Sequence, residues 1–213
     1  MFPLHSFSNN RLGFALLLLG VTVLTACEPM PVPPTLAPAL ALRATVVPAA
    51  TVGPLASAAI PEAGVTLMTP TSWKPPVAIS DAAAVISPTG STDTTYSAGV
   101  FMLVGDAHKL AKEKLTFNFR DDISDPVQQL TLLLAAINLD APNWTTAEVF
   151  SGAQYPAAVS VGFDRDNELT IVLINAGNNR WIYVGTQAPE RNYTYYNSAV
   201  FEPAIASITP ATP

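Results

Sequence analysis

Few side chains in this sequence could perform nucleophilic, acid–base or metal chemistry. The chain holds one cysteine, Cys27, and two histidines, His5 and His108. A Ser-His-Asp arrangement in the body of the chain would have to use His108, which lies in the polar run GDAHKLAKEK (105–114) without a G-x-S-x-G context. One histidine there cannot supply a Cys/His zinc site. We therefore predict that the protein is not an enzyme and that His108 is an ordinary surface residue.

Carboxylates gather in two places where hard oxygen ligands could hold Ca²⁺. One group precedes a predicted helix and the other occupies a predicted turn: Asp121, Asp122 and Asp125, then Asp164, Asp166 and Glu168. Neither group has the glycine or the distal glutamate of an EF-hand loop. The alternatives are a helix N-cap with favourable charge for the first group and a solvated hairpin turn for the second. We predict no cofactor, and only the second group remains a candidate metal site.

Aromatic side chains near predicted element ends form a candidate contact surface. Its members are Trp181, Tyr183, Tyr193, Tyr195 and Tyr196. The run YTYY (193–196) enters the last predicted helix, where successive positions cannot all face the core. At least one tyrosine there should be partly exposed, and exposed aromatics often mark contact surfaces. The alternative is that most of these rings belong to the core.

The region before Cys27 is typical of a secretory signal. Residues 1–26 carry one firm positive charge, Arg11, followed by the apolar stretch 13–24 and small residues. That stretch is shorter than the roughly 20 residues that a membrane-spanning helix needs.

The tetrapeptide LTAC (24–27) resembles the lipobox of bacterial lipoproteins, with threonine where alanine or serine is more usual. The resemblance implies cleavage before Cys27 and lipidation of its thiol with diacylglycerol and acyl chains such as palmitate. The protein would then be anchored to the extracytoplasmic face of a cell membrane. An ordinary signal peptide that leaves a free thiol, or an uncut N-terminal anchor, are the alternatives.

Cleavage at this point would make the mature protein acidic. Removing 26 residues from the 213-residue chain leaves 187, with nine basic and 16 acidic side chains and a formal charge of −7. This charge argues against nucleic-acid binding and against adsorption to anionic lipid head groups. With the only thiol lipidated no disulfide can form, so stability must come from a packed core.

A proline-rich segment follows the cysteine. Residues 28–62 hold eight prolines and only three charged side chains, so neither helix nor sheet should propagate there. We predict an extended tether over residues 27–62, either a passive spacer or a segment that docks on a membrane or partner.

Residues 63–208 are predicted to form one domain, with a disordered tail at 209–213. Apolar and alternating runs predict strands at 64–70, 76–80, 83–88, 97–105, 147–152, 155–164, 168–176 and 180–189. Hairpin turns are expected at 164–167 and 177–179. Helices are expected at 107–114, at 125–138 behind an Asp125 N-cap, and at 195–207, where Pro203 predicts a kink or a late start.

The helix at 125–138 should bury Val127, Leu130, Leu134 and Ile137. The last helix should bury Val200, Phe201 and Ile205.

Three short motifs carry a resemblance to a known group of domains. LMTPTSW (67–73), RWIYVGTQAP (180–189) and FEPAIASI (201–208) are similar to PsbP-like extrinsic proteins of photosystem II and to many bacterial lipoproteins. The resemblance implies an α/β domain of the α+β type, in which helices pack on the faces of a mostly antiparallel sheet. It does not carry photosystem binding, because fold alone does not define function.

The predicted function follows from the anchor, the tether and the missing catalytic residues. We expect a membrane-anchored lipoprotein that acts as a non-enzymatic binding or assembly module for another envelope protein. The alternative is a domain that binds a small ligand or Ca²⁺.

Overall fold

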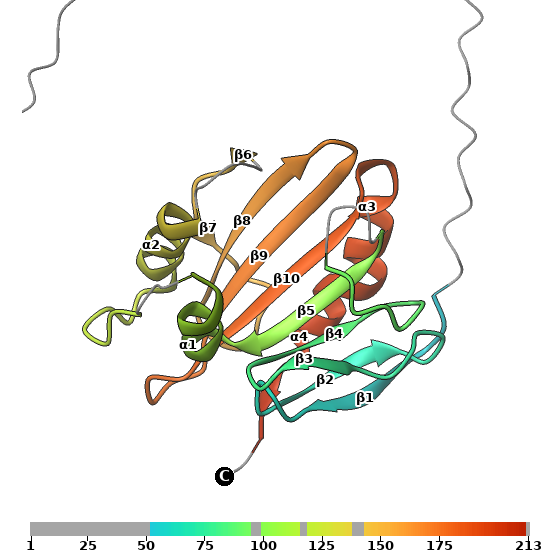
Figure 1. The fold of residues 1–213 in the computed structure, drawn as a ribbon, viewed down its shortest axis with the longest axis horizontal. Helices are drawn as coiled ribbons and strands as arrows, with labels where there is room; N and C mark the ends of the chain where they lie inside the picture. The colour runs from blue at the N-terminus through green and yellow to red at the C-terminus, as the bar shows by residue number, and fades with distance from the viewer. Residues whose placement is uncertain (1–51, 95–98, 116–118, 138–142, 212–213) are drawn as a thin grey trace, which may run out of the picture. The chain divides into compact units, whose positions relative to one another are not determined.

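The structure is a computed structural model that describes residues 52–94, 99–115, 119–137 and 143–211. Strands in these ranges form two sheets in which every pairing is antiparallel (Figure 1). The larger sheet has the order β3-β4-β5-β10-β9-β8-β6, and β7 also pairs with β8. Its strands are β3 (Val77–Ser80), β4 (Ala83–Ile86), β5 (Phe101–Asp106), β6 (Asn143–Trp144), β7 (Glu148–Val149), β8 (Ala157–Asp164), β9 (Asn167–Asn175) and β10 (Trp181–Pro189). The smaller sheet contains β1 (Leu55–Ile60), β2 (Val65–Pro70) and β11 (Thr209–Pro210).

Two tight hairpins connect β8, β9 and β10. The β9–β10 turn contains Gly177, Asn178 and Asn179, with φ of 81°, 51° and 57°. Glycine and asparagine tolerate this left-handed conformation better than other residues. The β8–β9 turn places Arg165 at φ 54°. Both hairpin predictions are confirmed.

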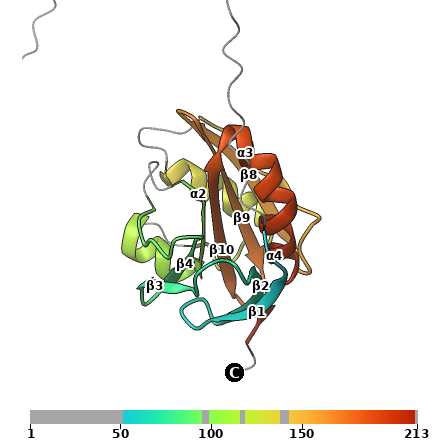
Figure 2. The same ribbon diagram turned by 90° about the vertical axis from the view of Figure 1, so that its right-hand side faces the viewer.

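Helices cover both faces of the larger sheet (Figure 2). One face carries α1 (Ala107–Leu110), its π-helical continuation Ala111–Leu115, and α2 (Pro126–Ile137). The opposite face carries α3 (Glu190–Tyr196), a π-helical segment Asn197–Phe201, and α4 (Glu202–Ala206). The predicted α+β architecture, a mostly antiparallel sheet with helices on its faces, is confirmed.

A separate apolar core lies on each face of the larger sheet. The larger core lies against the C-terminal helices and the smaller sheet, and includes Ile60, Leu67, Met102, Ile174, Ile182 and Phe201. The smaller core lies beneath α1 and α2, and includes Phe119, Leu130, Leu133, Leu173 and Trp181. Successive residues of a strand point to opposite faces, so β9 and β10 contribute to both cores.

Helix α2 begins as predicted and turns the predicted face toward the smaller core. Asp125 caps it, because its carboxylate accepts a hydrogen bond from the Val127 N–H at 2.9 Å. The buried positions are Pro126, Gln129, Leu130 and Leu133, whereas Val127, Leu134 and Ile137 are only partly buried. The predicted face is therefore the one that packs: Leu130 belongs to the smaller core, and Val127, Leu134 and Ile137 pack against it while partly exposed. Gln129 is buried as well, and its side-chain amide donates to the carbonyls of Arg120 and Ile123.

The folded domain extends beyond the predicted range at both ends. Strand β1 lies inside the segment 27–62 that was expected to be a tether, and pairs with β2 along its whole length. Strand β11 lies inside the expected disordered tail and pairs with Val65 and Thr66. The prolines beside β1, Pro54 and Pro61, stand outside the strand, where they interrupt no hydrogen bond of the ladder.

The last helix starts earlier than predicted, at Glu190, and passes Pro203 without ending. The π-helical segment Asn197–Phe201 precedes α4, and Pro203 falls in the first turn of α4, where a missing N–H costs least. Val200, Phe201 and Ile205 are buried as expected. None of the described helices is long and apolar enough to cross a membrane.

Candidate ligand-binding pocket

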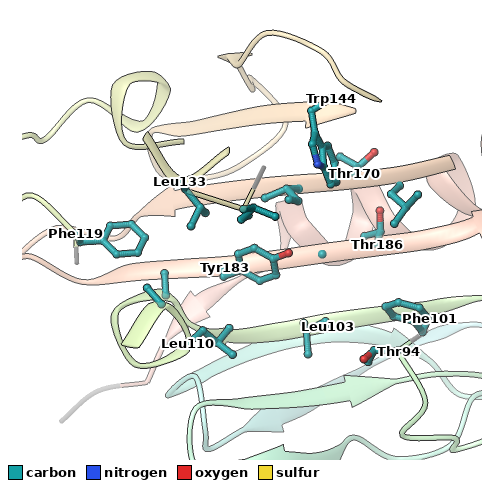
Figure 3. A pocket seen from close by; sticks show the side chains of 16 residues that line it. Thr94, Phe101, Leu103, Leu110, Phe119, Leu133, Trp144, Thr170, Tyr183 and Thr186 are labelled. Carbon is teal, nitrogen blue, oxygen red and sulfur yellow. The ribbon is translucent and has the colours of Figure 1, made fainter. Parts of the chain in front are cut away.

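A cavity of about 290 Å³ opens on the face of the larger sheet that carries α1 and α2. Its floor comes from β5, β9 and β10, and its walls come from α1, α2 and the β6 segment (Figure 3). The wall is largely apolar, and its described members are Thr94, Phe101, Leu103, Ala107, Leu110, Ala111, Phe119, Leu133, Ile137, Trp144, Leu169, Thr170, Ile171, Tyr183, Gly185 and Thr186. Small-molecule sites are typically concave and mostly apolar, with volumes of about 300–1,000 Å³.

A glycine in the central strand keeps the floor of this pocket open. Gly185 lies opposite Leu103 on β5 and opposite Ile171 on β9. A Cβ atom at this position would lie 3.1 Å from the Tyr183 ring, which therefore lies over the glycine. Glycine is unfavourable inside a strand and often marks a close approach by another group. Here it gives Tyr183 space to lie along the floor (Figure 3).

Stacked aromatic rings support the end of the pocket near α1. The ring of Phe119 lies 5.9 Å from Trp181 and 4.9 Å from His108, measured between centroids. The Nε2 atom of His108 lies 3.1 Å from the carbonyl oxygen of Asn179 in the β9–β10 turn. His108 is thus a partly buried residue on the surface of α1 whose ring contacts the β9–β10 turn.

Trp144 forms the opposite part of the wall. Its indole reaches from β6 toward the sheet near Thr170 (Figure 3). The Nε1 atom has almost no accessible surface, even from the cavity, and no hydrogen-bond partner among the described residues.

The two threonines of the floor direct their hydroxyl groups to the other face of the sheet. The hydroxyl of Tyr193 bonds to Thr170 Oγ1 and, at 3.0 Å, to Thr186 Oγ1. Burial raises the pKa of Tyr193, while these two hydrogen bonds act in the opposite direction. Engaged in this way, the threonines add little polarity to the pocket.

A smaller cavity of about 180 Å³ lies on the side of the C-terminal helices and is lined in part by Glu168 and Glu202. Burial raises the pKa of Glu168, and the nearby Glu190 carboxylate raises it further. The carboxylate of Glu202 accepts a hydrogen bond from the side-chain amide of Asn197 at 2.8 Å.

The candidate metal ligands lie around the β8–β9 hairpin. Asp164 and Asn167 form its last pair, and the backbone carbonyl of Asp166 accepts from the Glu190 N–H at 2.8 Å. Glu168 points into the smaller cavity. Across the described ranges no three His, Cys, Asp or Glu side chains are placed to share a metal ion.

The carboxylates before α2 each have a structural partner. Asp121 accepts from the Asn179 amide at 2.7 Å, and Asp122 pairs with Arg120 at 2.6 Å on the surface. The guanidinium of Arg120 lowers the pKa of Asp122. Together with the Asp125 cap, these contacts support the structural alternative for this group.

The predicted aromatic contact surface is not formed. Trp181, Tyr193 and Tyr196 are buried, because the first faces the core under α1 and α2 and the others face the core under the C-terminal helices. Tyr183 lines the pocket. Tyr195 is 37% exposed, as expected for one tyrosine of the run, and its hydroxyl accepts from the Val52 N–H at 3.2 Å. Cys27 lies outside the described residues.

A pocket between sheet and helix belongs to the alternative function expected from sequence, but sequence reasoning did not identify its lining, because the lining comes from distant parts of the chain. A signal was present in Gly185, which interrupts the apolar strand WIYVGTQAP (181–189) where a larger residue would be expected. Nothing local identified Trp144 or Phe119 as its neighbours.

Comparisons with known proteins give a likeness of fold. No protein-family model matches the chain, and no curated protein matches it either. The chain is similar to the solution structure of cyanobacterial PsbP (CyanoP) from Synechocystis sp. PCC 6803, at 12% sequence identity and a TM-score of 0.48. The likeness covers 75% of this chain and 94% of that one.

Proposed function

We propose that this protein is a non-enzymatic, membrane-anchored lipoprotein whose domain binds an apolar small molecule. The observation that carries the binding role is the pocket beneath α1 and α2, with its apolar wall and its glycine-lined floor. None of the described wall residues carries a charge, which favours an uncharged ligand because a buried unpaired charge is costly.

The anchoring part of the proposal rests on the sequence around Cys27. Lipidation of this thiol would attach the protein to the extracytoplasmic face of a membrane, and residues 28–51 would link the anchor to the domain. Each buried CH₂ group of an acyl chain contributes about 0.8 kcal/mol to membrane binding, so several chains hold a protein firmly.

Assembly with another envelope protein remains the alternative function. The aromatic surface that was expected to support it is largely buried, whereas the pocket offers a defined cavity. The geometry therefore favours small-molecule binding over assembly.

Equilibrium binding of an uncharged fluorescent dye, N-phenyl-1-naphthylamine, tests the pocket. We expect saturable binding to the purified full chain. Leu103→Trp adds a large ring on the pocket floor and should weaken binding at least tenfold, because it fills the cavity.

Val161→Trp is the matched control, because it adds the same ring on the opposite face, at the wall of the smaller cavity. It should leave the affinity within about twofold if both variants keep the wild-type circular dichroism spectrum. Absence of saturable binding to the wild-type chain, or equal loss in the two variants, would count against the proposed function.

A further inference from the structure

Tyr183 carries the polar group of the pocket wall that is best placed to meet a ligand. The described wall residues with a side-chain nitrogen or oxygen atom are Thr94, Trp144, Thr170, Tyr183 and Thr186. The hydroxyls of Thr170 and Thr186 are bonded on the other face of the sheet. The Nε1 atom of Trp144 has almost no accessible surface, and Thr94 is exposed to solvent, where water competes for its hydroxyl. The remaining group is the hydroxyl of Tyr183.

This hydroxyl lies at the floor of the cavity. Tyr183 and Gly185 are two residues apart on β10, so both project to the same face of the sheet. A Cβ atom on Gly185 would lie 3.1 Å from the Oη atom of Tyr183. Gly185 itself lines the cavity, so the space above this glycine belongs to the pocket and the phenol oxygen stands beside it (Figure 3).

The sheet holds Tyr183 in place before any ligand arrives. Its backbone lies opposite Gly105 on β5 and opposite Leu173 on β9, in the middle of the larger sheet. Its ring packs, partly buried, against the smaller core and against a neighbouring cluster that contains Leu110. A group fixed in this way binds with little loss of conformational freedom.

Apolar surface lies on either side of Tyr183 along the strand. The ring of Phe119 lies against Trp181, which precedes Tyr183 by two residues. Phe101 lies opposite Gln187, which follows Tyr183 by four residues. No described wall residue is charged, and a volume of about 290 Å³ is at the lower end of the range for small-molecule sites. The wall therefore favours a compact, largely apolar molecule over a lipid with two acyl chains.

We propose that the ligand is a compact, uncharged, largely apolar molecule with one hydroxyl group, and that this group forms a hydrogen bond with the hydroxyl of Tyr183. The inference rests on the proposed function, and it adds the chemical group that the pocket recognises. A hydroxyl can both donate and accept, so two hydroxyl groups can pair in either direction. A ligand hydroxyl without a partner in this cavity would oppose binding, because the loss of its hydrogen bonds to water is costly.

Two probes of similar shape separate recognition of the hydroxyl from binding to the apolar wall. They are 2-naphthol and 2-methylnaphthalene, in which a methyl group replaces the hydroxyl. Both are measured at pH 7 by displacement of N-phenyl-1-naphthylamine from the full chain. Tyr183→Phe keeps the ring and removes its oxygen, so it should weaken 2-naphthol binding at least about threefold, the effect of one hydrogen bond, and change 2-methylnaphthalene binding less than about twofold.

Tyr196→Phe is the matched control, because it removes the same group from a ring that belongs to the larger core and not to the pocket wall. It should leave both affinities within about twofold of wild type. Equal effects of Tyr183→Phe on the two probes would overturn the inference, and so would an equal loss of 2-naphthol binding in Tyr196→Phe. If the dye binds and neither probe displaces it, the inference is overturned and the proposed function stands. A dye that does not bind overturns both.

The wild-type chain alone gives a second test, which does not depend on the folding of a variant. With Tyr183 as its partner, 2-naphthol should bind no more than about fivefold more weakly than 2-methylnaphthalene, although it is the more polar molecule. A larger deficit is the result expected for a buried hydroxyl without a partner, and it would overturn the inference.

Discussion

Glu168 shows how the sheet and the helices change the ionisation of one carboxyl group. Burial and the Glu190 carboxylate raise its pKa above the ordinary value of 4.5. The folded protein therefore keeps this proton to a higher pH than the unfolded chain does. It follows that the free energy of unfolding falls as the pH rises through the window that begins near the ordinary value and ends at the raised one.

Glu168→Gln removes this ionisation and should raise the free energy of unfolding at pH 7. The gain should stay below about 1 kcal/mol, because the side chain is partly exposed and solvent screens its charge. Urea denaturation at pH 4 and pH 7 measures the effect, which should be smaller at pH 4. Glu148→Gln is the control at an exposed position and should change little at either pH. A variant less stable than wild type at pH 7 would contradict this explanation.

Single residues could be assigned from sequence only where their partners are close in the chain. The Asp125 cap was predicted correctly because its bonding partner, the Val127 N–H, lies two residues away. The burial of Gln129 was not predicted, because helical periodicity does not show that its side-chain amide can donate to the carbonyls of Arg120 and Ile123 in the preceding loop. The same limit applies to Trp144 and Gly185, which come to line one pocket only through the pairing of β6, β8, β9 and β10.

At the scale of elements, β1 marks where the folded domain begins. It pairs with β2 along six residues and places Ile60 in the larger core with no exposed surface. A chain that starts at residue 63 lacks this strand. Its free energy of unfolding should be lower than that of a chain starting at residue 52 by at least about 2–5 kcal/mol, the usual cost of removing one buried isoleucine side chain.

Urea denaturation of the two shortened chains beside the full chain tests this boundary. The chain that starts at residue 52 should match the full chain within about 0.5 kcal/mol, since it keeps every described strand. Equal stability of the chains starting at 52 and 63 would show that β1 adds nothing to the domain.

The β9–β10 hairpin could be predicted from the sequence, whereas strand β1 could not. The β9–β10 hairpin combines long alternating runs with Gly177 and two asparagines in one short stretch. Strand β1 is short, rich in alanine and set between Pro54 and Pro61, so its composition resembles the segment before it. The strand order could not be predicted, because β10 pairs with β5 across more than 70 residues of intervening chain.

At the scale of the whole molecule, one face of the larger sheet packs against the C-terminal helices and the opposite face carries the pocket. The chain enters the described domain at Val52, which packs against the larger core and donates to Tyr195 at the C-terminal helices. The pocket opens on the opposite face, beneath α1 and α2. The described wall residues all lie at or after Thr94, so a change near Cys27 alters none of them, and ligand binding should be independent of anchoring.

This independence gives a test of the proposed anchor. Cys27→Ser removes the thiol that would carry the lipid, so labelling with a palmitate analogue should be lost and the protein should leave the membrane fraction. Affinity for N-phenyl-1-naphthylamine should stay within about twofold of wild type, because no wall residue changes. Thr25→Ala is the matched control, since it brings the LTAC tetrapeptide closer to the usual lipobox and should preserve labelling. Labelling that survives in Cys27→Ser would show that the lipid is not attached to this cysteine.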